Sequence, residues 1–337
     1  MTLELNKEVV LVTGGTGSIG SALVESLLVR DVAKVIVFSR DETKHFVMKR
    51  RISDERLETM VGDIRSYRTV QQVFERFDVN LVYHVAAMKH VTMSEFFPLE
   101  ATKTNVIGTQ NIVELAKRHK VPKLINISTD KAVYPTNVLG ATKLIAERIV
   151  AEAGYTSVRF GNVAGSRGSA IPVLIEEMLR HKRLTVTDLR VTRFIMKIQD
   201  AVNLILEAKE LALGGDTFIL KMKAFKLAHL VEILVNKVGP DLGLDPKEIE
   251  VKKVGLVGGE KLHEELVAFE ELENLYELPG MYILTNNEKK ALPTGAKKVT
   301  LRERTSEDVE HLSRDDLSKV VYSVVESMKH FNAYSKP

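Results

Sequence analysis

Short apolar runs alternate with helical apolar patterns over the first half of the chain. Val9–Val12 is the first run and leads into a glycine-rich turn, after which apolar residues recur at helical spacing over Ser18–Val29. Lys34–Phe38 is a second run, β-branched and without alternation, as expected of a parallel strand that is covered on both faces. This order of strand, turn, helix and strand predicts the first βαβ unit of a parallel sheet.

The alternation continues to residue 160. The predicted elements are, in order, a strand near Met60–Val61, a helix over Val70–Phe77, a strand at Leu81–His84, a long helix over Leu99–His119, a strand at Leu124–Ile127, a helix over Asn137–Ala151 and a strand at Ser157–Phe160. Repeated units of this kind predict an α/β fold with a doubly wound parallel sheet, the Rossmann architecture.

Beyond Gly161 the pattern breaks into shorter pieces. These are a helix near Val173–His181, a strand-like segment at Thr217–Leu220, a helix over Leu227–Lys237 and a polar tail after Asn286. A chain of 337 residues is long enough for about two domains. We therefore expect a Rossmann domain over residues 1–165, to which some later segments return, a smaller α/β lid over residues 166–290, and a C-terminal extension over residues 291–337.

Composition restricts the classes of function. The chain is 45% hydrophobic and 28% charged, which is typical of a globular protein with a large core. Its 48 Lys and Arg residues barely exceed its 45 Asp and Glu residues and are scattered, so a nucleic acid partner is not expected. The absence of cysteine excludes disulfides, thiolate metal sites and thiol catalysis, and we expect no metal.

No apolar run approaches the roughly 18 to 20 residues of a membrane span. The residues before Val9 form a short polar lead and not a signal peptide. We therefore expect a cytoplasmic protein with no membrane partner.

The turn T-G-G-T-G-S-I-G, Thr13–Gly20, carries a specific motif. Its glycines have the spacing G-x-x-G-x-x-G between a strand and a helix. Glycine lets the backbone turn tightly and approach a pyrophosphate, whose charge is met by amide groups at the helix N-terminus. The turn therefore predicts a dinucleotide site, and the residues expected to contact the cofactor are Gly14, Thr16, Gly17, Ser18, Ile19 and Gly20.

The end of the second strand indicates which dinucleotide is bound. An acid about 20 residues after the glycine motif usually binds the ribose hydroxyls. Here the strand ends Phe38-Ser39-Arg40, which offers a hydroxyl and a guanidinium, and Asp41 follows directly. Ser39 and Arg40 suit a 2′-phosphate better than a free hydroxyl, so the sequence favours NADP over NAD.

Further cofactor contacts are expected after the third and fourth strands. They are Asp63 and Ile64 in V-G-D-I-R, Ala86, Ala87 and Lys89 in A-A-M-K-H, and Asn105 on the inward face of the long helix. Asp63 is placed to reach the adenine but could equally cap the next helix. His90 is interpreted as a hydrogen-bonded loop residue and not as a catalyst.

The segment S-T-D-K, Ser128–Lys131, follows the fifth strand. Open α/β sheets bind ligands at the carboxyl ends of their strands. An exposed Asp-Lys pair on a loop is usually solvated surface, but this pair lies at a strand end and twelve residues before Lys143 on a helix. Its position favours a functional interpretation.

Several separated blocks resemble one family, the extended short-chain dehydrogenases that act as UDP-N-acetylglucosamine 4,6-dehydratases. The blocks are the glycine turn, F-S-R-D-E, H-V-A-A-M-K-H-V, S-T-D-K-A-V-Y-P-T-N, R-F-G-N-V-A-G-S-R-G-S, V-T-R-F and G-E-K-L-H-E-E-L. The likeness runs from about Val9 to Leu266. It implies a lyase of polysaccharide biosynthesis that acts on UDP-N-acetylglucosamine and forms a homo-oligomer, a dimer or a hexamer.

The resemblance also implies catalytic roles. Lys143 would bind the nicotinamide ribose, Thr129 would hold the sugar 4-hydroxyl, Asp130 would protonate the departing 6-hydroxyl, and Lys131 would take the proton from C5. The set is chemically consistent, because oxidation at C4 acidifies the C5 hydrogen, water is lost from C6, and the stored hydride returns to C6. An amine base needs a depressed pKa, which we expect burial and the cofactor to give Lys131.

Contacts to the UDP and the sugar are expected from two regions. The candidates are Lys89, Asn162, Ser166 and Arg167, together with Arg193 and Glu260 from the lid. Arginine suits a diphosphate because its planar fork can bond two oxygens.

Leu139 departs from the family pattern. Many short-chain dehydrogenases have tyrosine four residues before the helix lysine, where it removes the proton of the hydroxyl being oxidised, and leucine cannot accept a proton. Some dehydratases that resemble this chain have methionine there, so an apolar residue is compatible with activity. Asp130 is the leading replacement, because it lies on a loop near the same hydroxyl. Tyr134 precedes a proline outside the helix and is not favoured.

Two other functions remain open. A UDP-hexosamine 4-epimerase would share the ketone intermediate and return the hydride to C4, but it needs neither an acid at O6 nor a base at C5. A non-catalytic dinucleotide-binding regulator would keep the fold and lose the tyrosine. Retention of Asp130, Lys131 and Lys143 together argues against the regulator.

Overall fold

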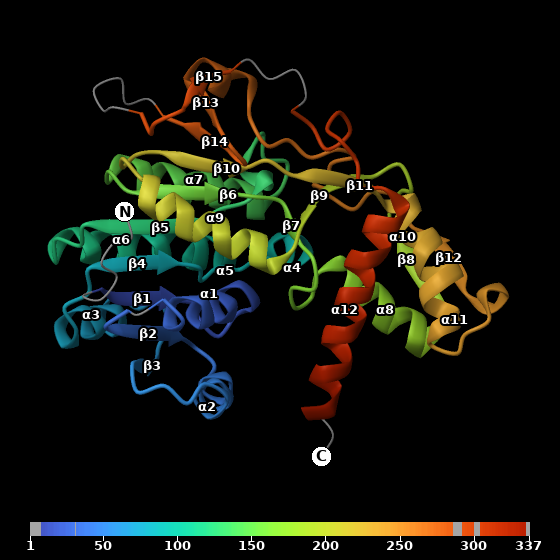
Figure 1. The fold of residues 1–337 in the computed structure, drawn as a ribbon, viewed down its shortest axis with the longest axis horizontal. Coiled ribbons are helices and arrows are strands. Elements are labelled where there is room, and N and C mark those ends of the chain that lie inside the picture. Colours follow the sequence, from blue (N-terminus) through green and yellow to red (C-terminus); the bar gives the residue numbers. More distant parts are fainter. Residues whose placement is uncertain (1–7, 31, 286–291, 300–303, 335–337) are drawn as a thin grey trace.

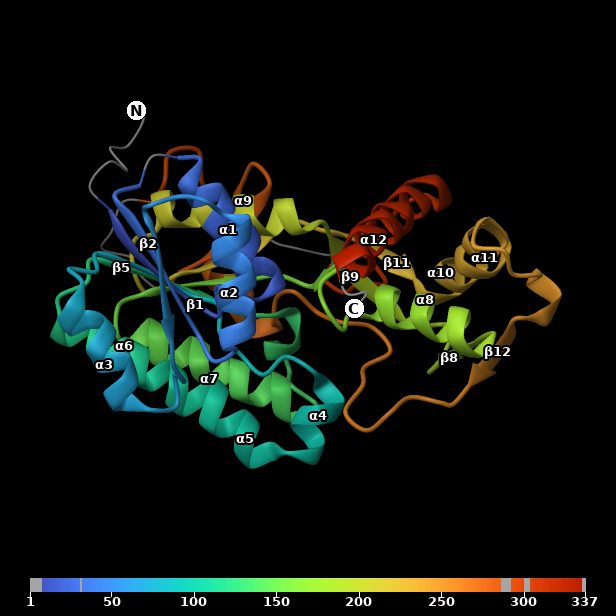
Figure 2. The same ribbon diagram turned by 90° about the horizontal axis from the view of Figure 1, so that it is seen from below.

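A ten-stranded sheet organises the fold, with helices on both of its faces (Figures 1 and 2). The computed structural model describes residues 8–30, 32–285, 292–299 and 304–334. Most of the polar lead before Val9 and the start of the polar tail at residue 286 lie outside the described residues. Within the described part of the chain, no helix is long and apolar enough to cross a bilayer.

The central seven strands are parallel, in the order β3-β2-β1-β4-β5-β6-β10, and three antiparallel strands extend the sheet beyond β10. Their bounds are β1 Val9–Thr13, β2 Lys34–Ser39, β3 Leu57–Val61, β4 Leu81–His84, β5 Lys123–Ile127, β6 Thr156–Arg159, β10 Thr217–Leu220, β14 Met281–Leu284, β13 Leu275–Leu278 and β15 Lys297–Lys298. This order confirms the predicted doubly wound α/β sheet.

Burial on both faces explains why the strands show no alternation. β1 lies between β2 and β4, with Val10 opposite Val35 on one side and Leu81 on the other. The four consecutive residues Val10–Thr13 of β1 are all buried, because each sheet face carries a layer of helices.

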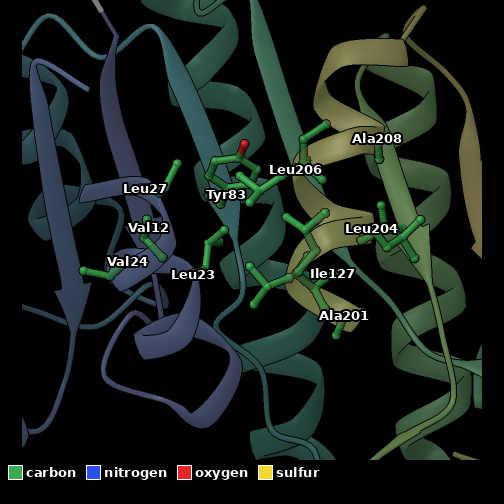
Figure 3. Close-up of a cluster of buried hydrophobic side chains, with 14 of the residues drawn as sticks. Val12, Leu23, Val24, Leu27, Tyr83, Ile127, Ala201, Leu204, Leu206 and Ala208 are labelled. Atoms are coloured by element: carbon green, nitrogen blue, oxygen red, sulfur yellow. The ribbon is translucent and has the colours of Figure 1, made fainter. Parts of the chain in front are cut away.

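Each helical layer has its own apolar core. The first layer consists of α1 Ser18–Leu28, α2 Glu42–Arg51 and α9 Ile198–Leu211, and the second of α3 Tyr67–Arg76, α6 Gly108–Arg118 and α7 Val138–Glu152. Figure 3 shows the first core, where Leu23 and Leu27 of α1 and Leu204 of α9 gather over the central strands.

The long helix predicted over Leu99–His119 is present with one irregularity. It consists of α5 Pro98–Thr102, a π-helical turn at Lys103–Ile107, and α6. A π-turn inserts an extra residue into the helical repeat and changes which side chains face inward. Asn105 lies in this turn and is buried.

A third apolar core lies beside the sheet, on the right of Figure 1. It is built from α8 Ala170–His181, β8 Arg183–Val186, α10 Leu227–Ile233, the π-turn Leu234–Val238, α11 Gly239–Asp241, β12 Glu250–Lys253 and α12 Arg314–Tyr334. A small sheet of β7 Asn162–Val163, β9 Thr192–Met196 and β11 Lys223–Lys226 adjoins it. Since β10, β13 and β14 return to the large sheet, segments after residue 165 belong to both bodies, and the domain boundaries stay a prediction.

Arg159 ties three elements together from the end of β6. Its side chain is 1% exposed and forms ion pairs with Glu147 of α7 at 2.7 Å and with Glu271 at 2.8 Å, in the 3-10 helix Phe269–Asn274. Burial alone would lower the pKa of Arg159, but the two carboxylates outweigh it and raise that pKa. The guanidinium and its partners therefore stay charged inside the protein, where each compensates the others.

We predict that Arg159→Ala lowers the free energy of unfolding by about 3 to 5 kcal/mol, because it leaves two buried carboxylates without their cation. A denaturant titration followed by circular dichroism measures the change. Arg190→Ala is the matched control, since its ion pair with Asp188 is exposed and its loss should leave the midpoint unchanged. Equal midpoints for both variants would contradict the structural role of Arg159.

Candidate active site

The glycine turn joins β1 to α1 with close backbone packing. Gly14 has φ +66°, and a Cβ there would lie 2.7 Å from the Cα of Ala86. A Cβ on Gly20 would collide with the carbonyl oxygen of Gly14, and the Gly17 amide donates to that same oxygen at 2.8 Å. No side chain caps the N-terminus of α1. The turn therefore fits a pyrophosphate, since it presents helix amides with no side chain in the way.

The residues at the end of β2 lie beside this turn. The Ser39 hydroxyl bonds the Thr16 hydroxyl at 2.9 Å and Nε2 of His45 at 2.8 Å. Burial raises the pKa of Asp63, but Arg65 and Arg40 outweigh it and hold that pKa below its usual range. The exposed Arg40 and the hydroxyl of Ser39 thus flank one side of the turn.

Asp63 is held by its own loop. Its carboxylate accepts from the Arg65 amide at 3.0 Å and from the Arg65 guanidinium at 2.8 Å. Ser66, and not Asp63, caps α3, because the Ser66 hydroxyl accepts from the Thr69 amide. Ile64 points into the core against Gly108, so its side chain serves packing.

Asn105 fixes the loop after β4. Its amide nitrogen donates to the Met88 carbonyl and to the Thr142 hydroxyl, both at 3.0 Å, and its carbonyl accepts from the Met88 amide at 2.8 Å. The loop carries Ala86, Ala87 and Lys89. Asn105 therefore holds the expected cofactor wall in place.

The predicted substrate residues Ser166 and Arg167 lie against the glycine turn. The Arg167 guanidinium donates to the Thr16 carbonyl, and the Arg167 amide donates to the Ser18 hydroxyl at 3.0 Å. Lys89 Nζ donates to the Arg167 carbonyl at 2.7 Å and to the Ser166 hydroxyl at 3.4 Å. Burial, and then Arg167, lower the pKa of Lys89.

His90 lies beside this loop. Its ring packs against Gly168, where a Cβ would approach Cε1 to 2.5 Å. Burial, and then Lys89, lower the pKa of His90, which favours a neutral ring.

Thr129, Asp130 and Lys131 form a compact group at the carboxyl end of β5. Asp130 is 0% exposed, and its Oδ1 accepts from the Thr129 hydroxyl at 2.9 Å and from Lys131 Nζ at 3.0 Å. Asp130 Oδ2 is buried and has no hydrogen-bond partner among the described residues. A buried carboxylate oxygen without a partner marks a place where a ligand or proton is expected.

A second carboxylate faces Lys131 from another segment. Glu264 lies 3.5 Å from Lys131 Nζ and is 3% exposed. The sequence analysis did not single it out, and the two adjacent acids in G-E-K-L-H-E-E-L were the only signal. Burial lowers the pKa of Lys131, but Asp130 and Glu264 outweigh it and raise that pKa above its ordinary value. The predicted depressed pKa of Lys131 is therefore wrong for the protein without ligands.

Lys143 and Leu139 lie on consecutive turns of α7, and both are buried. Lys143 Nζ donates to the Ile127 carbonyl at the end of β5. Burial lowers the pKa of Lys143 to about 8, although Glu147 opposes the shift. The apolar Leu139 leaves this part of the helix without an ionisable hydroxyl.

Tyr134 is engaged elsewhere. Its hydroxyl donates to Glu270 at 2.6 Å and accepts from the Phe269 amide at 2.8 Å. The side chain is exposed and holds the loop before α7 to the segment after Glu264. These contacts fit a structural role.

Asn162 of β7 and Arg193 of β9 lie beside Lys131 and Glu264. Asn162 Oδ1 lies 3.4 Å from Lys131 Nζ, and Arg193 Nε lies 3.9 Å from Glu264. Glu260 pairs with Arg193 at 2.7 Å and accepts from the Thr187 hydroxyl at 3.2 Å. The structure thus brings Asn162 and Arg193 to Lys131 and Glu264, while Ser166 and Arg167 lie at the glycine turn.

Two curated relatives align with most of the chain. An uncharacterised membrane protein of Methanocaldococcus jannaschii is 44% identical over 82% of this chain and 85% of its own length. A protein of Rickettsia canadensis named UDP-glucose 4-epimerase is 35% identical over 93% of this chain and 95% of its own length.

Two solved structures share the fold. Pen from Bacillus thuringiensis has a TM-score of 0.88 and 36% identity, covering 95% of this chain and 99% of its own. DesIV, a dTDP-glucose 4,6-dehydratase from Streptomyces venezuelae solved with NAD bound, has a TM-score of 0.66 and 25% identity, covering 75% of this chain and 86% of its own. The sequence model of the family described as polysaccharide biosynthesis protein matches residues 10–286. Because this match includes most strands of the large sheet and the group around Lys131, the chain belongs to the polysaccharide biosynthesis protein family.

Proposed function

We propose that the protein is a nicotinamide-dependent UDP-N-acetylglucosamine 4,6-dehydratase. The observation that carries this proposal is the contact between the buried Asp130 and the half-buried Lys131 at the carboxyl end of β5. Elimination of water across C5 and C6 needs a base at C5 and an acid at O6. The Asp130 carboxyl group and the Lys131 amine, 3.0 Å apart, supply this acid and this base.

The glycine turn would hold the dinucleotide, which would supply the hydride chemistry at C4 and C6. Thr129 binds the sugar 4-hydroxyl and passes its proton to Asp130, since the Thr129 hydroxyl already bonds Asp130 Oδ1. Asp130 thereby replaces the tyrosine that is absent at Leu139. Neutral Lys131 takes the C5 proton, Asp130 protonates the departing 6-hydroxyl, and Lys131 later returns its proton to C5. The proton taken from O4 therefore leaves in the water.

The expected sugar-nucleotide contacts follow the same geometry. Asn162 and Arg193 lie close enough to the Lys131 group to contact the sugar or the diphosphate. Arg167 and Lys89 lie near both the turn and the loop after β4, where a phosphate would meet two cations.

A homo-oligomer suits the surface over α4 Val91–Phe96 and α5. Large apolar side chains are exposed there, among them Phe96, Phe97 and Leu99. A contiguous apolar surface of this kind favours association with another protein, and the proposed partner is a second copy of the chain.

The epimerase alternative rests on the relatives named UDP-glucose 4-epimerase. Epimerisation shares the oxidation at C4 but leaves the mass of the sugar nucleotide unchanged. The ion pair of Asp130 and Lys131 favours the dehydratase, since an epimerase would have no use for a proton exchange at C5.

Incubation with UDP-N-acetylglucosamine and mass spectrometry test the proposal. The expected product has lost one water and carries one solvent deuterium at C5 when the reaction is run in heavy water. An unchanged mass with inverted C4 would identify an epimerase. No turnover with either cofactor would overturn the enzyme assignment and favour a regulator.

We predict that Lys131→Ala separates the two half-reactions. It should still form reduced nicotinamide from substrate, because Thr129 and Asp130 serve the oxidation, but it should release no water. Asp130→Asn should abolish both steps, because the O4 proton loses its acceptor. Single-turnover absorbance of the reduced nicotinamide and mass spectrometry measure the two steps.

Lys103 is exposed on the surface, so Lys103→Ala is the control for these variants and should behave as the wild type. Normal water loss by Lys131→Ala would place the C5 base elsewhere. Normal nicotinamide reduction by Asp130→Asn would remove Asp130 as the replacement for tyrosine.

We propose NADP as the cofactor, because Ser39 and Arg40 lie at the end of β2, where the 2′-phosphate of a dinucleotide held by the glycine turn is expected. Arg40→Ala should weaken NADP binding by about 1.5 to 3 kcal/mol, the range of a hydrogen bond to a charged group, and leave NAD binding nearly unchanged. Calorimetric titration of protein freed of cofactor measures both. Arg51→Ala, on the surface of α2, is the control, and equal weakening of both cofactors by Arg40→Ala would contradict the assignment.

A further inference from the structure

Glu264 is a buried carboxylate that the proposed mechanism does not use. Its Oε2 atom is buried and has no hydrogen-bond partner among the described residues, while Oε1 faces Lys131 Nζ at 3.5 Å. Its backbone is fixed independently, since the Glu264 amide donates to the Ser306 hydroxyl at 2.9 Å and the Ser306 amide donates to the Glu264 carbonyl at 2.7 Å. The carboxylate is therefore not needed to hold its own segment.

Lys131 needs a proton acceptor before it can act as a base. It lies between two carboxylates, which favour its ammonium form. Asp130 cannot take this proton, because it must accept the proton of the sugar 4-hydroxyl. Glu264 is the other carboxylate within reach.

The surroundings of Glu264 suit a group that holds a proton. The charged groups that face it are Lys131, Asp130, Arg193 and Lys261. Burial raises the pKa of Glu264 and outweighs the cations that oppose the shift. Arg193 lies 3.9 Å from Glu264 but pairs more closely with Glu260, at 2.7 Å, and Lys261 pairs with Glu265 at 2.6 Å, so each cation has another carboxylate as its nearest partner.

We infer that Glu264 is a positioning residue that takes the resting proton of Lys131 and so makes its amine available to the C5 hydrogen. This inference rests on the proposed function. The N–H bond of the Lys131 ammonium breaks, an O–H bond forms on Glu264, and the pair goes from two opposite charges to two neutral groups. The buried site neither gains nor loses a proton, so Lys131 becomes a base without help from the solvent.

The pH dependence of C5 exchange tests this internal transfer. In the wild type, deuterium uptake at C5 from heavy water should be nearly independent of pH across the neutral range. In Glu264→Gln, Lys131 must lose its proton to solvent. Its C5 exchange should therefore fall by about tenfold for each pH unit below the pKa of Lys131 and recover at high pH.

Three measurements make the result specific. Glu264→Gln should still form reduced nicotinamide, because Thr129 and Asp130 are intact, and this signal reports a folded, loaded enzyme. Glu264→Asp keeps a carboxyl group and should restore the flat profile at a lower rate. Glu248→Gln removes an exposed carboxylate that pairs with Lys182 far from the site, and this variant should keep the wild-type profile.

The outcomes separate this inference from the proposed function. If Glu264→Gln slows C5 exchange by the same factor at every pH, Glu264 holds no proton for Lys131 and the inference is overturned. If the wild type neither reduces its cofactor nor loses water, the proposed function fails as well. Wild-type dehydration with a steep profile only in Glu264→Gln supports both.

Discussion

The arrangement of the site depends on one buried cation. Arg159 must be compensated by carboxylates, because a lone charge in the interior costs several kcal/mol. Its partners are Glu147, one turn after Lys143 on α7, and Glu271, seven residues after Glu264. The ion pairs of Arg159 therefore fix two parts of the site. One is α7, which carries Lys143, and the other is the segment that carries Glu264, the carboxylate that faces Lys131.

The same constraint explains why the pKa values of Lys131 and Lys143 shift in opposite directions. Asp130 and Glu264 lie 3.0 and 3.5 Å from Lys131 Nζ, and their charges raise its pKa. Glu147, the carboxylate near Lys143, is already neutralised by Arg159, so burial dominates and the pKa of Lys143 falls to about 8. Burial alone does not predict the direction of a pKa shift. The direction also depends on whether the nearby charges are already paired with other groups.

Local patterns predicted the sheet, the glycine turn and the place of Asp130, since strand periodicity and strand ends are properties of neighbouring residues. The sequence analysis missed α2, which buries only His45 and Met48 and so shows no apolar stripe, and α4, which is six residues long. It also missed α9, and it took the region of α12 for part of a polar tail. Glu264 and the contact of Arg167 with the glycine turn depend on segments more than 130 residues apart, for which periodicity gives no signal. The expectation of a depressed pKa for Lys131 was wrong for the same reason, because one of its two carboxylate neighbours, Glu264, is distant in sequence.

The antiparallel end of the sheet limits how copies of the chain can associate. A parallel sheet that stopped at β10 would leave a row of unpaired amides and carbonyls open to another strand. β14 and β13 cover that row, and the outermost strand β15 consists of two exposed lysines, whose charges oppose further strand addition. Growth into a continuous intermolecular sheet is therefore opposed at this edge of the sheet.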